Sequence, residues 1–163
     1  MNNTNDLIIR DMAEDDMETV AEIFTEELFH HTELLPERFQ LADPIFNSGW
    51  YMDVLSNPKM PLIVAELNST VVGVLLLKLN RSPDDPIFTP RLYVTVEEVA
   101  VAERFRGQGI GRRLMDYALQ WAIDQGADEI ELDVWEKNEG AIALYEKLGY
   151  EVVRRKMRIV LYE

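Results

Sequence analysis

The run from Val96 to Arg113 constrains the fold of this chain most strongly, because it reads as a strand, a glycine-rich turn and the start of a helix. The strand covers Val96–Ala102, the turn covers Arg106–Gly111, and the helix is expected to open at Arg112. Glycine recurs at every second position of the turn, so the backbone can approach a bulky anion without Cβ atoms in the way. The first helical turn adds unpaired N–H groups and the positive end of a dipole. Together these features predict a phosphate-binding unit.

Positive charge gathers around this turn although the chain as a whole is acidic. The formal net charge is −14 and the pI is near 4.5, yet arginines stand at 104, 106, 112 and 113. An acidic total disfavours nucleic-acid binding, which relies on neutralising phosphates. The same charge either serves solubility or steers a cationic acceptor toward the protein, and both interpretations stay open.

Two familiar phosphate motifs do not fit the turn. A dinucleotide fingerprint would need glycine at position 112 or 114, where Arg112 and Leu114 stand. A P-loop counted from Gly107 would need Gly-Lys-Ser/Thr from position 112, and the chain reads Arg-Arg-Leu there. What remains is the pattern R-x-x-G-x-G, formed by Arg106, Gly109 and Gly111.

A second pattern lies downstream of the turn. Asn138 precedes the sequence A-x-x-L-Y-x-x-x-G-Y, which runs from Ala141 to Tyr150. The first pattern alone also suits a purely structural tight turn, whereas the two patterns in this order are more specific. Together they resemble the two signatures of the GCN5-related N-acetyltransferase (GNAT) family, and the resemblance is clear from about Glu97 to Tyr150.

The resemblance implies an enzyme that uses acetyl-CoA as cosubstrate and transfers its acetyl group directly to a primary amine. In the family's fold two parallel strands splay and the pantetheine arm lies between them. Val99 and Val101 would bond the arm through backbone N–H and C=O groups, and the turn would hold the diphosphate. The cofactor-binding positions implied in this way are Val99, Ala100, Val101, Arg106, Gly107, Gln108, Gly109, Ile110, Gly111, Arg112, Asn138 and Tyr145.

The chemistry of amide formation indicates which further groups are needed. An amine attacks a thioester only as the neutral base, and a lysine-like amine has a pKa of ~10.4, so a general base or water relay and some desolvation are required. Backbone N–H groups of the strand can stabilise the oxyanion. The thiolate leaves more easily when it is protonated.

Two residues match the family's second motif: Asn138 and, on the helix that follows it, Tyr145. Tyr145 occupies the position of the general acid that protonates the leaving thiolate; its structural alternative is a core tyrosine on an amphipathic helix. Asn138 matches the residue that bonds the pantetheine or a nearby carbonyl. Asparagine is also a good N-cap for a helix from Glu139, and both roles are compatible.

Three carboxylates are candidates for the general base. Glu97 and Glu98 lie on the strand before the turn, where family members often place a base or a water-holding carboxylate. Strict strand alternation would send them to opposite faces, so that at most one enters the cleft, and Glu98 is favoured. Asp133 lies on the next strand, where some family members that modify protein N-termini carry a glutamate. Each of the three carboxylates also fits a merely solvated role.

The order of predicted elements indicates an α/β (α+β) protein with a central twisted mixed sheet flanked by helices, in a single domain spanning residues 1–163. A strand–helix–strand unit around the glycine turn implies a parallel pair. The predicted elements are a strand at 7–10, a helix from about 11–16 to 29 followed by His30 and His31, a short helix at 48–55, a hairpin of 61–67 and 71–79, a loop at 80–90, a strand at 91–102, a helix ending before Gly126, a strand at 129–134, a helix at 139–148 and a closing strand at 150–161.

Composition and the chain's start limit the other possibilities. The chain has no cysteine, which excludes disulfides and thiolate chemistry, and the two histidines have no third ligand nearby, so no metal site is expected. The first residues lack the features of a signal peptide, and the longest apolar run is too short to span a bilayer. A cytoplasmic enzyme without nucleic-acid or membrane partners is therefore expected, with a two-fold homodimer as the default assembly.

The sequence leaves one alternative function and the acceptor open. A non-catalytic acyl-CoA-binding or regulatory module could use the same fold, since fold does not fix function. The acceptor site would be built from the irregular parts, residues 30–60 and 80–90. A small amine, an aminoglycoside, a free amino acid and a protein N-terminus all remain acceptable, and a longer acyl group is a weaker option.

Overall fold

The computed structural model describes residues 6–42 and 45–162 and divides the chain into two compact units, one up to Asp133 and one from Val134. Two parts of the chain lie outside the described residues. They are residues 1–5, where no signal peptide was predicted, and residues 43–44, in the region predicted to be irregular. The elements of the first unit are β1 (Leu7–Asp11), the 3-10 turn η2 (Glu14–Asp16), α1 (Met17–Leu34), α2 (Ser48–Leu55), β2 (Leu62–Leu67), β3 (Thr70–Arg81), β4 (Leu92–Val101), the 3-10 turn η3 (Glu103–Phe105), α3 (Ile110–Asp124) and β5 (Glu129–Leu132). The second unit contains α4 (Glu139–Lys147).

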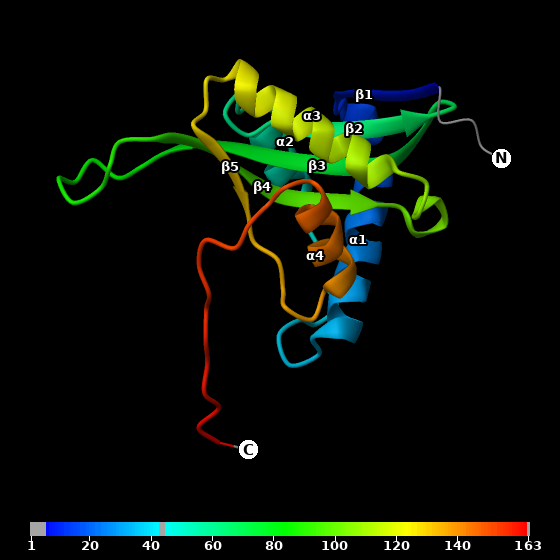
Figure 1. Cartoon of the computed structure of the whole chain (residues 1–163). Coiled ribbons are helices and arrows are strands. Elements are labelled where there is room, and N and C mark those ends of the chain that lie inside the picture. The colour runs from blue at the N-terminus through cyan, green and yellow to red at the C-terminus, as the bar shows by residue number, and fades with distance from the viewer. Residues whose placement is uncertain (1–5, 43–44, 163) are drawn as a thin grey trace. The chain divides into compact units, whose positions relative to one another are not determined.

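The first unit is built on a mixed sheet whose five described strands follow the order β1-β2-β3-β4-β5 (Figure 1). The first four strands pair antiparallel, and β4 pairs with β5 in parallel. The parallel pair is the one predicted from the strand–helix–strand order around the glycine turn. The predicted mixed sheet is therefore confirmed.

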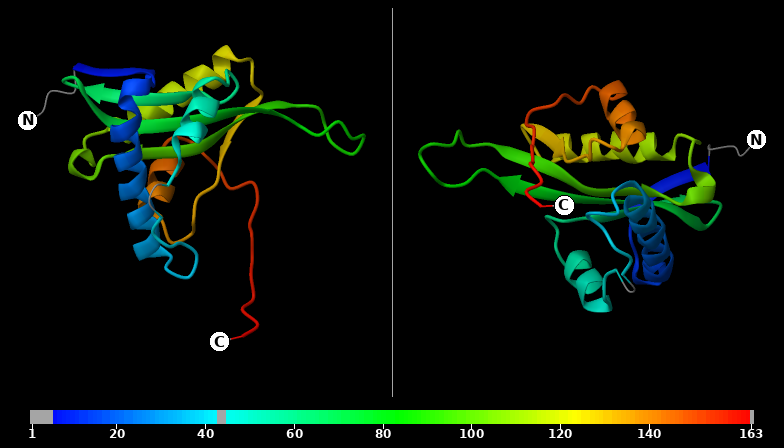
Figure 2. Two further views of the ribbon diagram at one scale, coloured as in Figure 1. Left: turned by 180° about the vertical axis from the view of Figure 1, so that it is seen from behind. Right: turned by 90° about the horizontal axis from the view of Figure 1, so that it is seen from below.

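Helices cover both faces of this sheet. Figure 2 shows α3 on one face, with α1 and α2 on the other. On the α1 side the core joins Val20 and Phe24 of α1 to Val74 and Leu76 of β3, all of them buried. On the α3 side the contact is so close that a Cβ on Gly73 would lie 3.1 Å from Leu114. A small residue at this position therefore lets the start of α3 pack directly on β3.

The hairpin between β2 and β3 forms as predicted, around Asn68 and Ser69. Both residues have positive φ, 51° and 60°. A two-residue loop with two positive φ angles matches the right-handed twist of the flanking strands, and asparagine tolerates that conformation well. The short helix predicted at 48–55 is also present, and Asn47 caps it by accepting a hydrogen bond from the Trp50 N–H at 2.9 Å.

Several predicted boundaries differ from the structure. The strand predicted at 71–79 covers Thr70–Arg81, so it includes the first two residues of the loop predicted at 80–90. The helix expected to end near Phe29 continues to Leu34, so His30 and His31 lie inside α1. The apolar pattern stops earlier because the last turn is polar, but Glu27 and His31 pair across one turn at 3.6 Å and help to continue it. The helix expected to open at Arg112 begins at Ile110, and the strand expected to reach Val134 ends at Leu132.

The closing strand predicted for residues 150–161 is wrong for this structure. Residues 151–162 have no regular secondary structure and are exposed. The segment is rich in apolar and β-branched residues, as strands often are. A strand needs a neighbour to complete its hydrogen bonds, and the described part of the second unit contains no other strand. Seven large apolar side chains of this segment are 67–90% exposed: Val152, Val153, Met157, Ile159, Val160, Leu161 and Tyr162.

Candidate active site

The glycine turn between β4 and α3 adopts a conformation that only glycine accepts easily. Gly107 and Gly109 have φ of 73° and 81°, in the left-handed region. A Cβ at either position would meet no atom within 4 Å. The glycines are therefore required by the backbone path, and the space above them is open to an incoming group.

The backbone amides of this turn are available to a ligand. The helical hydrogen-bond ladder of α3 begins with the Arg113 N–H, which donates to the Gly109 carbonyl at 3.1 Å. Among the residues that the structure describes, no backbone N–H from 107 to 112 donates a hydrogen bond within the protein. Several donors and the positive end of a four-turn helix thus converge on one exposed loop, as anion binding requires.

The arginines around the turn have different tasks. Arg106 donates from Nε to the Val101 carbonyl at 3.0 Å, and its Nη2 lies 3.5 Å from Glu27 on α1. Arg113 reaches the Leu7 carbonyl at 3.3 Å. Arg112 is more open than Arg106, with a side chain 61% exposed against 37%. The Arg106 side chain therefore fixes the loop to the sheet and to α1, which leaves the expected diphosphate contacts to the backbone and to Arg112.

Beside the turn, β4 has an open edge where the predicted pantetheine arm would lie. The parallel pairing with β5 covers Tyr93–Val96 only, so the last five residues of β4 have no β5 partner. The Ala102 N–H donates to Val72 on the opposite side at 2.9 Å. Because backbone groups alternate along a strand, those of Val99 and Val101 face away from β3, toward the open edge. The backbone groups of Val99 and the N–H of Val101 thus face the edge that β5 leaves open, whereas the Val101 carbonyl accepts the hydrogen bond from Arg106.

A β-bulge in β4 changes the expectation for Glu97 and Glu98. Leu76 of β3 pairs with Glu98, but its neighbour Leu77 pairs with Val96, so Glu97 is an extra, unpaired residue. Strict alternation, on which the opposite-faces argument rested, therefore does not hold here, because a bulge rotates the side chains that follow it. Glu97 is exposed and Glu98 is half-buried, with Glu98 now on the same face as Ala100 and the core of α1.

Glu98 has the electrostatic character of a base that works near neutral pH. Burial raises the pKa of its carboxyl group to about 7, and the negative charges of Glu27 and Glu97 add to this rise. A base is most effective when its pKa lies near the working pH. The raised pKa of Glu98 therefore matches the requirement set by the chemistry.

Glu27 is a residue that the sequence reasoning missed. Its Oε2 lies 3.5 Å from Arg106 and its Oε1 lies 3.6 Å from His31, with the side chain only 17% exposed. It connects α1 to the glycine turn and also raises the pKa of Glu98. Its spacing of four residues from His31 was the only local signal, and such pairs are common on helix surfaces.

In the second unit, Asn138 and Tyr145 lie on the helix that was predicted for them. Asn138 is the N-cap of α4 and accepts the Ala141 N–H through Oδ1 at 3.2 Å, so its capping role is confirmed. The half-buried Tyr145 has its ring centroid 5.8 Å from that of Tyr150. Burial, with a smaller contribution from Tyr145, raises the pKa of Tyr150 to about 12. Asp133, at the end of the first unit, is exposed and follows β5 instead of lying within it.

The described residues also bear on the expectations about membranes and metals. In residues 6–42 and 45–162, no helix combines the length and apolar character needed to cross a bilayer. Nor does any group of three His, Asp or Glu side chains in that part of the chain form a set that could hold a metal ion.

Comparison with known proteins identifies the family. An uncharacterized N-acetyltransferase of Methanocaldococcus jannaschii is 31% identical over 115 residues, which are 68% of this chain and 50% of that protein, so the chain spans about half of its length. N-alpha-acetyltransferase 50 of Danio rerio is 28% identical over 129 residues, covering 78% of this chain and 73% of that protein. A crystal structure of a mutant protein from Bacillus halodurans matches with a TM-score of 0.90 at 26% identity, over 95% of this chain and 99% of that chain. The model of the acetyltransferase (GNAT) family matches residues 17–150, from α1 through the glycine turn to the end of the second signature, and this chain belongs to that family.

Proposed function

We propose that the protein is an acetyl-CoA-dependent N-acetyltransferase that transfers the acetyl group directly to a primary amine. The observation that carries the proposal is the glycine turn at the head of α3, where backbone amides from 107 to 112 have no acceptor within the described residues. This loop lies next to the unpaired end of β4. Membership of the GNAT family and the relatives named N-acetyltransferases support the same activity.

The cosubstrate would be held by main-chain groups of the first unit. The diphosphate accepts hydrogen bonds from the amides at 107–112, and the pantetheine arm bonds the backbone of Val99 and Val101 along the open edge of β4. Arg106 keeps the loop in place through Val101 and Glu27 and need not touch the ligand with its side chain. These contacts bring the thioester beside the bulge that carries Glu98.

Proton transfer completes the reaction. Glu98, directly or through one water, takes a proton from the acceptor ammonium, whose nitrogen then forms a bond to the thioester carbonyl carbon. A strand N–H stabilises the oxyanion, and the C–S bond breaks as the amide forms. Tyr145 gives its proton to the departing thiolate, and the second proton that the nitrogen loses as the amide forms returns Tyr145 to its neutral form. We propose Glu98 as the base in preference to Asp133, because Asp133 is exposed to solvent and Glu98 has the raised pKa that the task requires.

A binding measurement tests the cosubstrate. Acetyl-CoA at one hundred times its Kd should stabilise the folded protein by about 2.7 kcal/mol in a thermal unfolding experiment. A Gly109→Val variant should lose most of this stabilisation, because a β-branched residue does not easily adopt the left-handed backbone conformation of Gly109. Equal stabilisation of both proteins would mean that acetyl-CoA binds somewhere other than the glycine turn.

Turnover separates the enzyme from the alternative, a non-catalytic acyl-CoA-binding module. A panel of primary amines is screened for CoA release in the presence of acetyl-CoA, with small amines, aminoglycosides, amino acids and peptides with free N-termini. For an active acceptor, Tyr145→Phe should lower kcat and leave acetyl-CoA binding intact. Binding without CoA release across the whole panel would favour the module. An unchanged kcat in Tyr145→Phe would remove Tyr145 from the mechanism.

We also propose that the protein is a homodimer. The exposed apolar side chains of residues 151–162 form a surface of the kind that association usually covers. Light scattering coupled to size exclusion should give twice the chain mass of 18.9 kDa. Val153→Glu together with Ile159→Glu should reduce this to the monomer mass, and a wild-type protein that is already monomeric would refute the proposal.

A further inference from the structure

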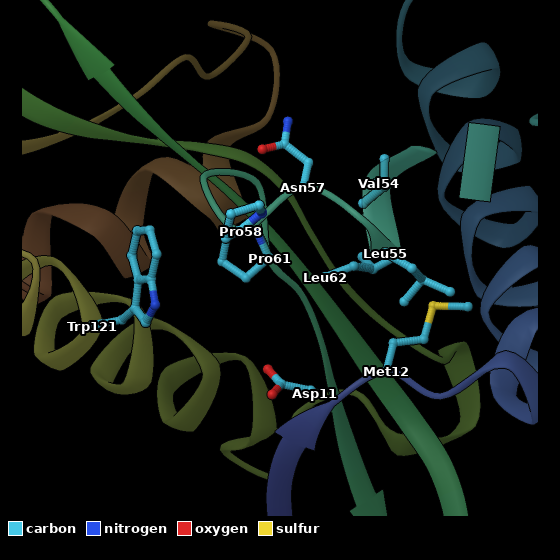
Figure 3. Close-up of a pocket in the computed structure, with 9 residues that line it drawn as sticks. All are labelled: Asp11, Met12, Val54, Leu55, Asn57, Pro58, Pro61, Leu62 and Trp121. Atoms are coloured by element: carbon cyan, nitrogen blue, oxygen red, sulfur yellow. The ribbon is translucent and has the colours of Figure 1, made fainter. Parts of the chain in front are cut away.

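The first unit contains a cavity that the proposed function does not use. It has a volume of about 330 Å³ and lies among the end of β1, the end of α2, the start of β2 and the last third of α3 (Figure 3). Trp121, which lines it, follows Ile110 by 11 residues on α3. At the rise of an α-helix this places it roughly 16 Å from the glycine turn. The cavity is thus at the opposite end of α3 from the proposed diphosphate site.

The walls of the cavity differ in polarity from one side to the other. Figure 3 shows Trp121 and the carboxylate of Asp11 toward one side, and Met12, Val54 and Leu55 toward the other. Met12 and Val54 are each only 5% exposed, so the apolar side is part of the core. A ligand that fills this space must carry an apolar body at one end and a group that suits a carboxylate and an indole at the other.

The charge at the polar side is negative, and no described residue forms an ion pair with it. Within the described residues, the Asp11 carboxylate makes no hydrogen bond or ion pair, and no lining residue is basic. The neighbouring Arg10 forms ion pairs with Asp16 at 2.6 Å and Glu66 at 2.7 Å, and it contacts Asp11 at the backbone carbonyl, to which its Nη1 donates at 3.0 Å. The C-terminal end of α3 adds to the negative potential, because it is the negative end of the helix dipole and its last turn has no basic residue.

The pKa of Tyr117 indicates the same negative electrostatic potential near the cavity. Burial raises the pKa of Tyr117, one helical turn before Trp121, and the charges of Asp11 and Asp124 raise it further. Anionic ligands are therefore disfavoured here. An ammonium group would be attracted both by the carboxylate and by the face of the indole, since tryptophan is the best cation–π acceptor.

We propose that this cavity is a binding site for an organic cation with an apolar body, its ammonium group held between Asp11 and Trp121 and its apolar part packed on Met12 and Leu55. The site goes beyond the acetyl-transfer site and is independent of it. An ammonium that cannot be acetylated should occupy it as well as a primary amine does.

The test uses phenylethyltrimethylammonium, which has no nitrogen lone pair and cannot serve as an acetyl acceptor. The 163-residue chain contains three tryptophans, so its ¹H–¹⁵N spectrum should show three indole N–H signals, and Trp121→Phe identifies one of them. Titration should move the Trp121 signal saturably, with a Kd on the order of 1 mM for so small a ligand. The signals of Trp50 and Trp135 are internal references and should stay in place. 2-Phenylethanol, which has the same ring and no charge, should bind more weakly.

Variants decide whether the charge is recognised. Asp11→Asn should weaken binding of the cation by roughly threefold or more and leave 2-phenylethanol unaffected. Asp15→Asn makes the same charge change at an exposed residue outside the cavity and should leave the Kd unchanged. Both variants should keep the wild-type spectrum elsewhere, which verifies the fold.

Three results would overturn the proposal. The first is a Trp121 signal that does not move up to about 10 mM of the cation, well above the expected Kd. The second is an equal effect of the cation and the alcohol, and the third is a Kd unchanged by Asp11→Asn. Because none of these measurements involves acetyl-CoA, they leave the proposed acetyltransferase activity untouched.

Discussion

Replacing Glu98 by glutamine should remove the base and reveal its unusual pKa. If Glu98 acts as a general base, Glu98→Gln should lower kcat by about 10² to 10⁴. The wild-type rate should depend on the ionised fraction of a carboxyl group whose pKa is about 7. Below pH 7 the ratio of wild-type to variant kcat/KM should therefore fall about tenfold per pH unit, and above pH 8 it should be level. Taking the ratio cancels the titration of the acceptor amine, which affects both proteins alike.

The same pKa predicts a change in stability with a definite sign. The pKa of the Glu98 carboxyl group is about 7 in the folded protein, whereas its ordinary value is 4.5, so folding favours the protonated form. Its stabilising contribution is thus complete below pH 4.5 and is lost as the pH rises toward 7. At 1.36 kcal/mol per pKa unit, the ionised form costs up to about 3 kcal/mol at pH 8. Glu98→Gln should be more stable than wild type at pH 8 by up to this amount, and equal to it at pH 4.

Neighbouring carboxylates supply a matched pair of controls. Glu27→Gln removes a charge that raises the pKa of Glu98, so the acidic limb of the wild-type profile should move to lower pH. Glu22→Gln makes the same change at an exposed site on the same helix and should leave the limb in place. The assay is CoA release with a fixed amine, and chemical denaturation at each pH gives the stability.

Two results would refute this reasoning. A kcat/KM ratio that is level from pH 5 to pH 9 would show that Glu98 does not donate or accept a proton in the rate-limiting step. A Glu98→Gln protein less stable than wild type at pH 8 would show that the ionised carboxylate is stabilised in the fold, so that the environment inferred from its burial is wrong.

Three further changes probe the turn, its support and the second signature. In urea unfolding, Gly109→Ala should destabilise the protein by about 1–2 kcal/mol through backbone strain alone, since its Cβ would meet no atom. The control is Gly140→Ala, at a helical glycine with ordinary φ, which should be neutral or stabilising. Gly73→Ala should cost about 1–3 kcal/mol, because its Cβ would lie 3.1 Å from Leu114 and 3.3 Å from a β4 carbonyl, and it should weaken acetyl-CoA binding by shifting the start of α3. Asn138→Asp keeps the N-cap, so stability should be retained; a fall in turnover would then assign Asn138 to the cosubstrate, and unchanged turnover would leave it as a cap only.

Local patterns were sufficient wherever the structure depends on neighbours in sequence. The helix at 48–55, the hairpin around Asn68 and Ser69, the turn glycines and the N-cap at Asn138 follow from propensity, turn chemistry and capping, all of which act over a few residues. The family resemblance extended this to the fold, because two short signatures fix the order of the strand, loop and helices between them.

Long-range packing decided the rest. The β4 bulge arises from pairing with β3, and no local signal shows that Glu97 is the extra residue. The raised pKa of Glu98 depends on burial beneath α1 and on Glu27, which is 71 residues away in the sequence and was not a candidate. The prediction of a closing strand failed for a related reason, since an apolar stretch can favour a strand but cannot provide the neighbour that a strand requires.

By itself, the sequence determined that the chain has a glycine turn able to expose its amides at a helix start, because the left-handed angles at two glycines are a property of the backbone. Only the tertiary structure decided which carboxylate has its pKa moved to neutrality and which end of α3 faces a cavity. Burial and the field of distant charges are set by how elements pack, and packing brings together residues that the order of the chain keeps apart.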